Sequence, residues 1–337
     1  MKKYRLLLMC MMGAAVIAAA CWYKNKLEED RSVPDYVLTS AENQTEEYPT
    51  TQAARYFADM VWEQTEGKVE IRIHPNAELG SELSVIEQIQ YGGIDFSRIS
   101  LSSLSDTVPQ LNVLQMPYIY TGAEHMWRVL DGEIGEEFMN SMDAVPIVPL
   151  SWFDAGSRCF YTVDRPVSCL EDLKGLKIRV QESKLLQDVI RCLGADPVPL
   201  PYDQVYSALE TGRVDGAENN WPSYEAMKHN EVAPYFTVNG HMRIPEMQII
   251  SRHTWDKLPP EYQRTIRECA RESARYERRL WREQEQKAKE NVIEEGCLVT
   301  EIPEEEKERF RQAVMPLYEK YCSGSMDIVE RIIKLGE

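Results

Sequence analysis

The segment 174–224 contains side chains that could bind a small anion. Arg179 is the third residue of the run KIRV (177–180), and Asn219 ends the run VDGAEN. A guanidinium presents a planar set of donors that matches a carboxylate through two parallel hydrogen bonds, and an asparagine amide can both donate and accept. An arginine on a strand is otherwise a surface or ion-pair residue, and asparagine is common in turns. These residue types therefore permit a carboxylate site that includes Arg179.

Short strands and a helix position these residues. The alternation of apolar and basic residues predicts a strand over Leu176–Val180, and a second strand is predicted at Val198–Leu200. A helix should follow, with Asp203 as its N-cap and Gly212 at its end. Alternating strands and helices are typical of parallel strands in an open α/β sheet, whose ligands lie beyond the carboxyl ends of the strands. Arg179 is expected at such an end.

The rest of the chain repeats this pattern and adds one long helix. One βαβαβ unit is predicted near the N-terminus, and the second such unit starts near Ser151. Residues 259–291 predict a long helix with one apolar face and a mostly charged surface. The N-terminal unit comprises strands at Val37–Ser40, Val69–His74, Ile94–Ser100 and helices near 51–66 and 82–92.

The composition is that of a globular protein large enough for two domains. The chain has 337 residues, of which 43% are apolar and 28% charged, and its formal net charge is −17. An acidic chain lacks the basic footprint that the phosphate backbone of nucleic acid requires, so no nucleic-acid partner is expected. A bound anion would need local positive charge from arginines in a cleft.

The N-terminus predicts export and a lipid anchor. Lys2, Lys3 and Arg5 precede the apolar run 6–20, which has the length of a signal peptide. The run IAAAC, which ends at Cys21, resembles a lipoprotein cleavage box. We therefore predict a signal peptide at 1–20, lipid on Cys21, a tether at 21–34 and an extracytoplasmic protein anchored to the cell membrane or periplasmic. An ordinary signal peptide or an uncleaved anchor are the alternatives.

The other side chains with chemical potential give no catalytic or metal motif. Six further cysteines show no zinc-ligand spacing, so no metal or cofactor is expected, and their disulfide pairing is left open. The sequence contains no G-x-S-x-G, no H-E-x-x-H and no P-loop. An enzyme acting on sugar acids stays an alternative that turnover would reveal.

Several motifs together resemble one family. KGLKIRV, PLPYDQVYSALETG and VDGAEN occur in this order, with PNAELGSE upstream and GHMRIPEMQIIS downstream. The chain resembles the solute-binding proteins of TRAP transporters, the DctP family, over nearly its whole mature length. The resemblance implies an α/β, two-lobed fold of the periplasmic-binding-protein type II kind, with a long helix bridging both lobes and a hinged cleft. It places lobe 1 at 35–155 plus 245–284 and lobe 2 at 156–244 plus 285–337.

The resemblance also assigns roles to individual residues. It makes Arg179 the carboxylate clamp, Arg158 a second anion-binding arginine and Asn219 an orienting amide. Asn220 and Trp221 depart from the commoner pattern, and an indole face beside a polar amide favours a polyhydroxylated acid over a plain dicarboxylate. Trp221 could equally be a core residue. The other expected contacts are Glu42, Asn43, Tyr48 and Glu82 from lobe 1, with Asp154, Tyr202 and His241 as weaker candidates, although each could instead have a structural role.

The expected function is therefore that of a non-catalytic receptor. The resemblance implies a protein, expected to be monomeric, that captures a uronate such as glucuronate or galacturonate and delivers it to the small and large membrane subunits of a TRAP permease. A receptor for C4-dicarboxylates or other organic acids, and a sensor ectodomain, are the alternatives.

Overall fold

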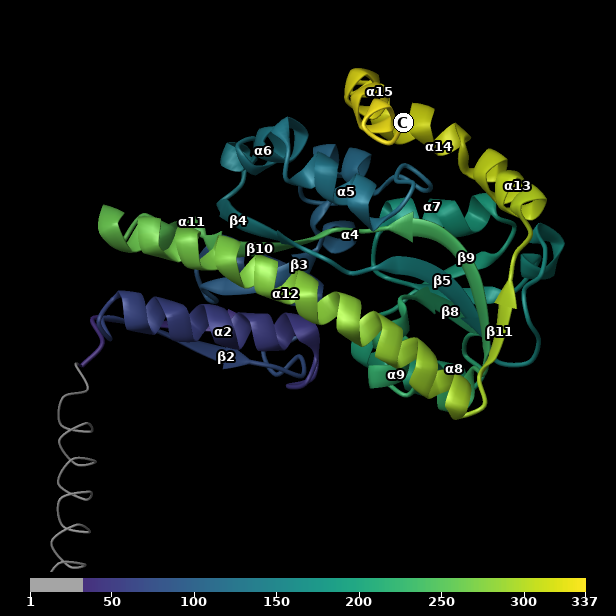
Figure 1. Ribbon diagram of the computed structural model, residues 1–337, viewed down its shortest axis with the longest axis horizontal. Coiled ribbons are helices and arrows are strands. Elements are labelled where there is room, and N and C mark those ends of the chain that lie inside the picture. The colour runs from purple at the N-terminus through teal and green to yellow at the C-terminus, as the bar shows by residue number, and fades with distance from the viewer. Residues whose placement is uncertain (1–32) are drawn as a thin grey trace, which may run out of the picture.

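The computed structural model describes residues 33–337, which form two lobes side by side, each built on its own sheet (Figure 1). The sheet of the first lobe has the strand order β2-β1-β3-β10-β4, and that of the second has the order β11-β9-β5-β8-β6-β7. The chain passes between the sheets from β4 to β5 and returns from β9 to β10. Two crossings of this kind are the geometry from which a hinge between lobes is built.

The first sheet is mostly parallel near the N-terminus, as the βαβαβ pattern predicts. Strand β1 runs parallel to β2 and β3, and β10 pairs antiparallel with β3 and β4. Helix α2 (Pro49–Gln64) covers one face, where Phe57 packs on Phe96. The strands of this sheet are β1 (Tyr36–Ala41), β2 (Val69–His74), β3 (Phe96–Ser100), β4 (Ile147–Phe153) and β10 (Glu246–Ser251).

The second sheet places Arg179 near the carboxyl end of a parallel strand. Strand β6 runs parallel to β7 and β8, whereas β5 pairs antiparallel with β8 and β9. The strands are β5 (Ser157–Thr162), β6 (Lys177–Val180), β7 (Asp196–Pro199), β8 (Gly216–Asn219), β9 (Tyr235–Arg243) and β11 (Leu298–Glu301). Its helices are α7 (Lys184–Cys192), α8 (Val205–Glu210), α9 (Trp221–Ala226) and α10 (His229–Val232).

The start of α8 differs from the prediction. Strand β7 ends at Pro199, and a 3₁₀ turn over Tyr202–Gln204 leads directly into the helix. Asp203 lies inside this turn, and α8 has no side-chain cap. The prediction of Asp203 as the N-cap was wrong because the backbone is already helical before α8 begins.

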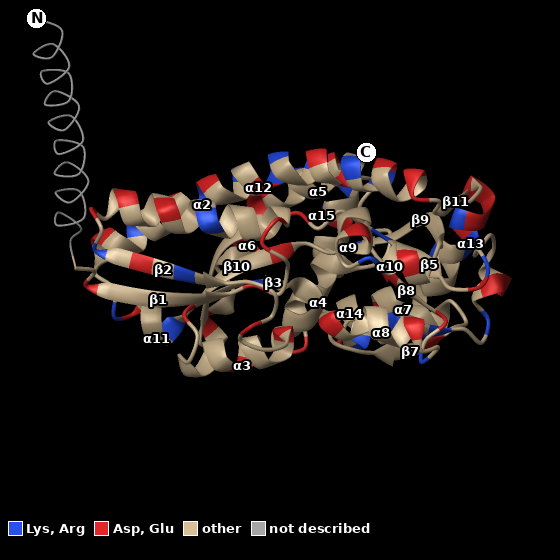
Figure 2. Ribbon diagram, turned by 90° about the horizontal axis from the view of Figure 1, so that it is seen from below, with Lys and Arg blue, Asp and Glu red and all other residues tan. Residues whose placement is uncertain are grey.

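Helix α12 (Pro260–Glu294) bridges both lobes. It contacts α2 and β4 in the first lobe and α9 in the second, and both views show it running along the length of the molecule (Figures 1 and 2). Its buried face contains Ile266, Ala270 and Trp281, whereas charged residues cover its outer surface (Figure 2). The apolar face predicted from helical spacing is therefore present.

The C-terminal helices contact both lobes, whereas the predicted lobe boundaries assigned them to the second lobe alone. Helix α13 (Glu304–Val314) contacts α7 and β9 of the second lobe. Helix α15 (Met326–Lys334) reaches the first lobe, because His125 Nε2 lies 2.7 Å from Ile332 O and Arg331 pairs with Glu137 at 2.7 Å. The prediction placed all of 285–337 in lobe 2, whereas α15 lies against α5 (Ala123–Leu130) and α6 (Glu133–Met139).

Short elements complete the fold, and several predictions lie outside the described residues. The short elements are α3 (Glu82–Tyr91), α4 (Leu101–Leu104), α11 (Arg252–Trp255), α14 (Pro316–Cys322) and 3₁₀ segments at Pro109–Gln115, Met142–Ala144 and Leu170–Leu173. The predicted signal peptide, Cys21 and nearly all of the tether fall outside 33–337. No helix within 33–337 is long and apolar enough to cross a membrane. The six cysteines in this range are free, and no group of potential metal ligands is assembled there.

Candidate ligand-binding cleft

A narrow cavity separates the two lobes near the carboxyl end of β6. The first lobe contributes the segments after β1 and before α3, and the second contributes the ends of β6 and β7. An adjoining small cavity shares Asn43, Ala77 and Glu82 and extends to Arg98. The principal cavity is lined by Asn43, Ala77, Ser81, Glu82, Ser103, Arg179, Gln181, Glu182, Leu200, Pro201, Tyr202 and Asp203.

Arg179 lines this cavity and has no carboxylate partner within residues 33–337. Its side chain is 1% exposed, and its Nε and Nη2 both donate to Leu200 O, at 3.0 and 2.6 Å. Its Nη1 is buried and has no hydrogen-bond partner among the described residues. Burial lowers the pKa of Arg179, with a further contribution from Arg158. The backbone thus orients the guanidinium and leaves one charged edge available for an anion.

Arg158 is already paired within the protein. Its Nη2 donates to Glu218 Oε1 at 2.7 Å, its Nε pairs with the other carboxylate oxygen, and its Nη1 donates to Asn219 Oδ1 at 3.2 Å. Burial opposes ionisation of Glu218, but Arg158 and His241 more than compensate and lower its pKa to about 2. The second predicted arginine is therefore neutralised by a buried carboxylate before any solute binds.

A second buried cluster lies on the first-lobe side. Arg98 contacts Glu42 through two nitrogens and Glu246 Oε1 at 3.0 Å, and Glu82 lies 3.8 Å away. Its Nη2 also donates to Asn43 Oδ1 at 2.6 Å. Although burial lowers it, the three carboxylates raise the pKa of Arg98. One cation thus serves three acidic side chains, and the first-lobe wall is acidic overall.

Tyrosine hydroxyls join the lobes beside the cavity. Tyr48 Oη and Ser223 Oγ, which belong to opposite lobes, lie 2.8 Å apart. Tyr202 lines the cavity, and its hydroxyl is buried without a partner among the described residues. Burial raises the pKa of Tyr202 to about 12, and the neighbouring Ser223 and Gln44 oppose this rise. These hydroxyls stay protonated at neutral pH and can donate hydrogen bonds.

Asn219, Asn220 and Trp221 are close in sequence but face different surroundings. Asn219 ends β8, and its Oδ1 accepts from Arg158 and from the Asn220 backbone. Asn220 caps α9, since its Oδ1 accepts from Ser223 N at 2.8 Å, and its Nδ2 donates to Ala155 O at 2.9 Å. Trp221 packs in the second-lobe core, with its ring centroid 3.5 Å from that of Phe236. This position argues against the sugar-stacking role predicted for Trp221.

Asp154 and His241 also have partners away from the cavity walls. Asp154 lies in the β4–β5 connection and accepts from Trp127 Nε1 at 3.0 Å and from Gly156 N at 2.9 Å. His241 is fully buried, stacks on Phe160, and lies 3.5 Å from Glu218. Both positions suit a structural role at the hinge and behind Arg158 better than direct contact with a solute.

Sequence reasoning named Glu42 and Glu82 but missed Arg98, Glu218 and Glu246. Arg98 lies inside β3, where all five residues are buried, so a charged residue in a predicted buried strand was the available signal. Glu218 stood within VDGAEN, directly before Asn219. Glu246 comes from β10, 148 residues from Arg98, and no local pattern connects them.

Comparison with known proteins places this geometry in one family. A model of the bacterial extracellular solute-binding proteins, family 7 (DctP), matches residues 40–324. A solute-binding protein of Chromohalobacter salexigens is 37% identical over 274 residues, which cover 81% of this chain and 81% of that protein.

Solved structures agree with the family match. A TRAP periplasmic solute-binding protein from a Bradyrhizobium species, in complex with D-galacturonate, superposes with a TM-score of 0.86 and 39% identity over 88% of this chain and 99% of that one. One from Roseobacter denitrificans with bound β-D-glucuronate has a TM-score of 0.84 and 36% identity, covering 89% and 98%. The chain therefore belongs to the DctP family of bacterial extracellular solute-binding proteins, which are receptors and not enzymes.

Proposed function

We propose that this protein is the receptor of a TRAP transporter for a hexuronate, such as galacturonate or glucuronate, which it delivers to the small and large permease subunits. The observation that carries the proposal is the buried guanidinium of Arg179, whose Nη1 has no partner among the described residues at the wall of an interlobe cavity. Similar structures with bound galacturonate and glucuronate support the choice of ligand class.

Arg179 provides the carboxylate half of this recognition. A carboxylate at its free edge would gain charge-assisted hydrogen bonds, each contributing about 1.5 to 3 kcal/mol. The two bonds to Leu200 O hold the guanidinium in place beforehand, so little side-chain entropy is lost on binding. Arg158, which is committed to Glu218, supports the site by positioning Asn219.

The first-lobe wall favours hydroxyl groups over a second carboxylate. Glu42, Glu82 and Glu246 share the single cation Arg98. Burial raises the pKa of Glu246 to about 8, so this side chain is mostly protonated at neutral pH, and an added carboxylate would meet the other two acidic side chains. Sugar hydroxyls can donate to carboxylate oxygens and accept from Asn43 or Tyr202. A monocarboxylate that carries several hydroxyls therefore matches this cleft better than a C4-dicarboxylate does.

Entry of the solute requires the lobes to separate. The cavity is small, at about 30 Å³, and the Tyr48–Ser223 contact joins the two lobes. The connections at 153–157 and 243–246, together with α12, are the segments that can bend while each sheet stays intact. Capture by closure around the solute follows from this arrangement.

Thermal unfolding of residues 22–337 against a panel of solutes tests the proposal. A ligand that binds the native state raises the midpoint by mass action, so galacturonate or glucuronate should raise it, whereas succinate and neutral galactose should not. A shift with succinate alone would replace the uronate by a dicarboxylate, and turnover of the uronate would contradict a receptor.

Anchoring by lipid on Cys21 and a monomeric state belong to the same proposal. Val33, the first described residue, is 82% exposed, which suits a tether to a membrane. In cells, the natural protein should fractionate with membranes and a Cys21→Ser variant should not. Equal membrane association of both would refute lipidation, and a dimer mass in sedimentation would refute the monomer.

A further inference from the structure

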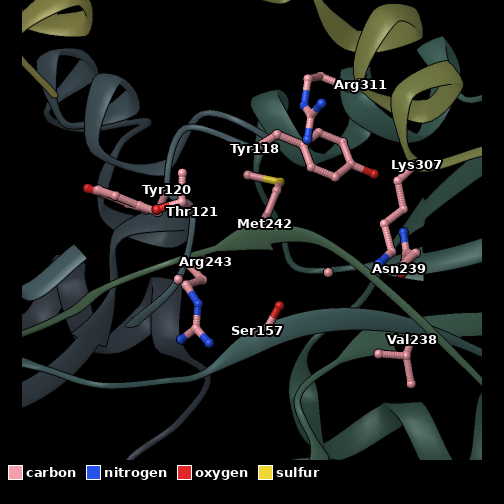
Figure 3. A pocket seen from close by; sticks show the side chains of 12 residues that line it. Tyr118, Tyr120, Thr121, Ser157, Val238, Asn239, Met242, Arg243, Lys307 and Arg311 are labelled. Carbon is pink, nitrogen blue, oxygen red and sulfur yellow. The ribbon is translucent and has the colours of Figure 1, made fainter. Parts of the chain in front are cut away.

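A second cavity lies where the two lobes meet, away from the cleft (Figure 3). Its volume is about 380 Å³. The loop 118–122, which precedes α5 in the first lobe, forms one wall, and α13 forms another. The floor is formed by β5 and β9 near the crossing between the sheets, with Ser157 and Asn239 among the lining residues.

The charge of this cavity is opposite to that of the whole protein. Arg243, Lys307 and Arg311 line it, and no acidic side chain does, although the chain carries a net charge of −17. Arg243 forms no ion pair within 33–337. Burial raises the pKa of Glu285 and the charge of Arg243 opposes this rise, although the two side chains form no ion pair.

Within residues 33–337, Lys307 and Arg311, the other two cations, pair only with exposed carboxylates on their own helix. Lys307 Nζ lies 3.5 Å from Glu304, and Arg311 pairs with Glu308, each within α13. Exposed pairs of this kind contribute about 0 to 1 kcal/mol, so they would compete weakly with an anion in the cavity.

Neutral donors add to the cations. The Tyr118 hydroxyl is buried without a partner within the described chain, and Figure 3 shows Tyr118, Asn239 and Lys307 around the same space. Tyr118 also has a backbone φ of 59°, which a large non-glycine residue adopts only at an energetic cost. Its backbone N–H donates to His241 O at 3.0 Å, and Arg311 lies 5.5 Å from its ring centroid. The fold thus maintains a strained backbone conformation at Tyr118, in the loop that forms one wall of the cavity.

We propose that this cavity is a second binding site, for a small organic anion with two or more carboxylates, separate from the interlobe cleft. Three cations distributed around a cavity of this size match several carboxylates better than one, and the tyrosine, serine and asparagine groups provide hydrogen bonds of the appropriate polarity. The walls come from both lobes, so a bound anion would contact the two lobes at their junction.

Calorimetric titration with citrate at constant ionic strength tests this site. The natural protein should bind one citrate per chain, and Lys307→Gln/Arg311→Gln should weaken binding at least tenfold. The matched control is Arg309→Gln/Lys320→Gln, which removes two neighbouring positive charges outside the cavity and should change the affinity less than twofold. Arg179→Met removes the cleft cation and should also leave citrate binding within twofold.

The outcomes separate this site from the cleft. Loss of citrate binding in Arg179→Met would place the anion in the cleft and overturn the proposal. An unchanged affinity in the Lys307/Arg311 variant, or no saturable binding by the natural protein, would overturn it as well. If that double variant fails to fold, Ser157→Ala and Lys307→Gln serve singly, and each should weaken citrate binding while the control does not.

Discussion

Replacement of Arg179 by methionine separates solute binding from stability. Methionine retains an unbranched side chain of similar reach but removes the charge. A bound carboxylate would then lie buried without its partner, and breaking a buried ion pair in this way costs about 3 to 5 kcal/mol. Since about 1.4 kcal/mol corresponds to a factor of ten, the Kd for the uronate should rise roughly 10²- to 10³-fold or more.

The same change should affect the solute-free protein far less. Burial and the nearby charge of Arg158 both lower the pKa of Arg179. Arg179→Met therefore removes the energetic cost of burying this charge. It also removes the donors to Leu200 O, at a cost of about 1 to 3 kcal/mol. The two contributions oppose each other, and we expect the thermal midpoint without solute to change by only a few degrees.

Titration calorimetry with galacturonate and glucuronate measures the effect. Arg213→Met is the matched control, because Arg213 is an exposed arginine of the same lobe and should leave Kd within twofold. Arg179→Lys keeps the charge but loses the planar fork, so its loss should lie between those of the natural protein and the methionine variant. A loss of tenfold or less in Arg179→Met would refute the clamp.

Three further predictions follow from the cleft. Arg158→Met should lower the unfolding free energy by about 3 to 5 kcal/mol because Glu218 would be buried without its arginine partner. Urea unfolding measures this, and Glu218→Gln in the same chain should recover part of the loss. Tyr48→Phe should weaken uronate binding by about 0.5 to 1.5 kcal/mol through the lost contact with Ser223. Ser223→Ala should give the same loss of binding free energy. Strictly additive effects in the double variant would contradict a direct hydrogen bond between the two side chains. Burial, together with Glu82 and Glu42, raises the pKa of Glu246 to about 8, although the charge of Arg98 opposes this rise. The folded protein therefore holds this proton more tightly than the unfolded chain does. The resulting contribution to stability is fully present below about pH 4.5 and is lost as the pH rises towards 8. Glu246→Gln should therefore flatten the decline in unfolding free energy between pH 5 and pH 8, and an unchanged decline would refute the assignment.

The elements of the fold were largely predictable because they depend on local periodicity. Alternation of apolar and basic residues marked β6, and helical spacing with Pro260 at the start marked α12. The start of α8 was mispredicted because a 3₁₀ turn precedes the helix, and residues 198–204 contain both proline and good capping residues. Local patterns of this kind do not distinguish a capped helix from one that continues a turn.

The partners within the site were less predictable. The indole of Trp221 stacks on Phe236, since β9 brings that ring beneath α9, and nothing near Trp221 in the sequence announces it. The end of the chain lies against the first lobe because α15 presents Ile332 to the first lobe's His125, although α13 still contacts the second. Both outcomes depend on which elements become neighbours in space.

The sequence by itself determined the strands and helices, the acidic character of the chain and the position of Arg179 near the end of a parallel strand, because these follow from backbone periodicity and residue chemistry. Only the tertiary structure decided which charges meet. Arg158 pairs with Glu218 because β5 lies beside β8, 60 residues later, and Arg98 meets Glu246 because β10 inserts between β3 and β4. Sheet order arises from the packing of the whole chain. This tertiary arrangement therefore decided that Arg179 is the cleft arginine without a carboxylate partner among the described residues.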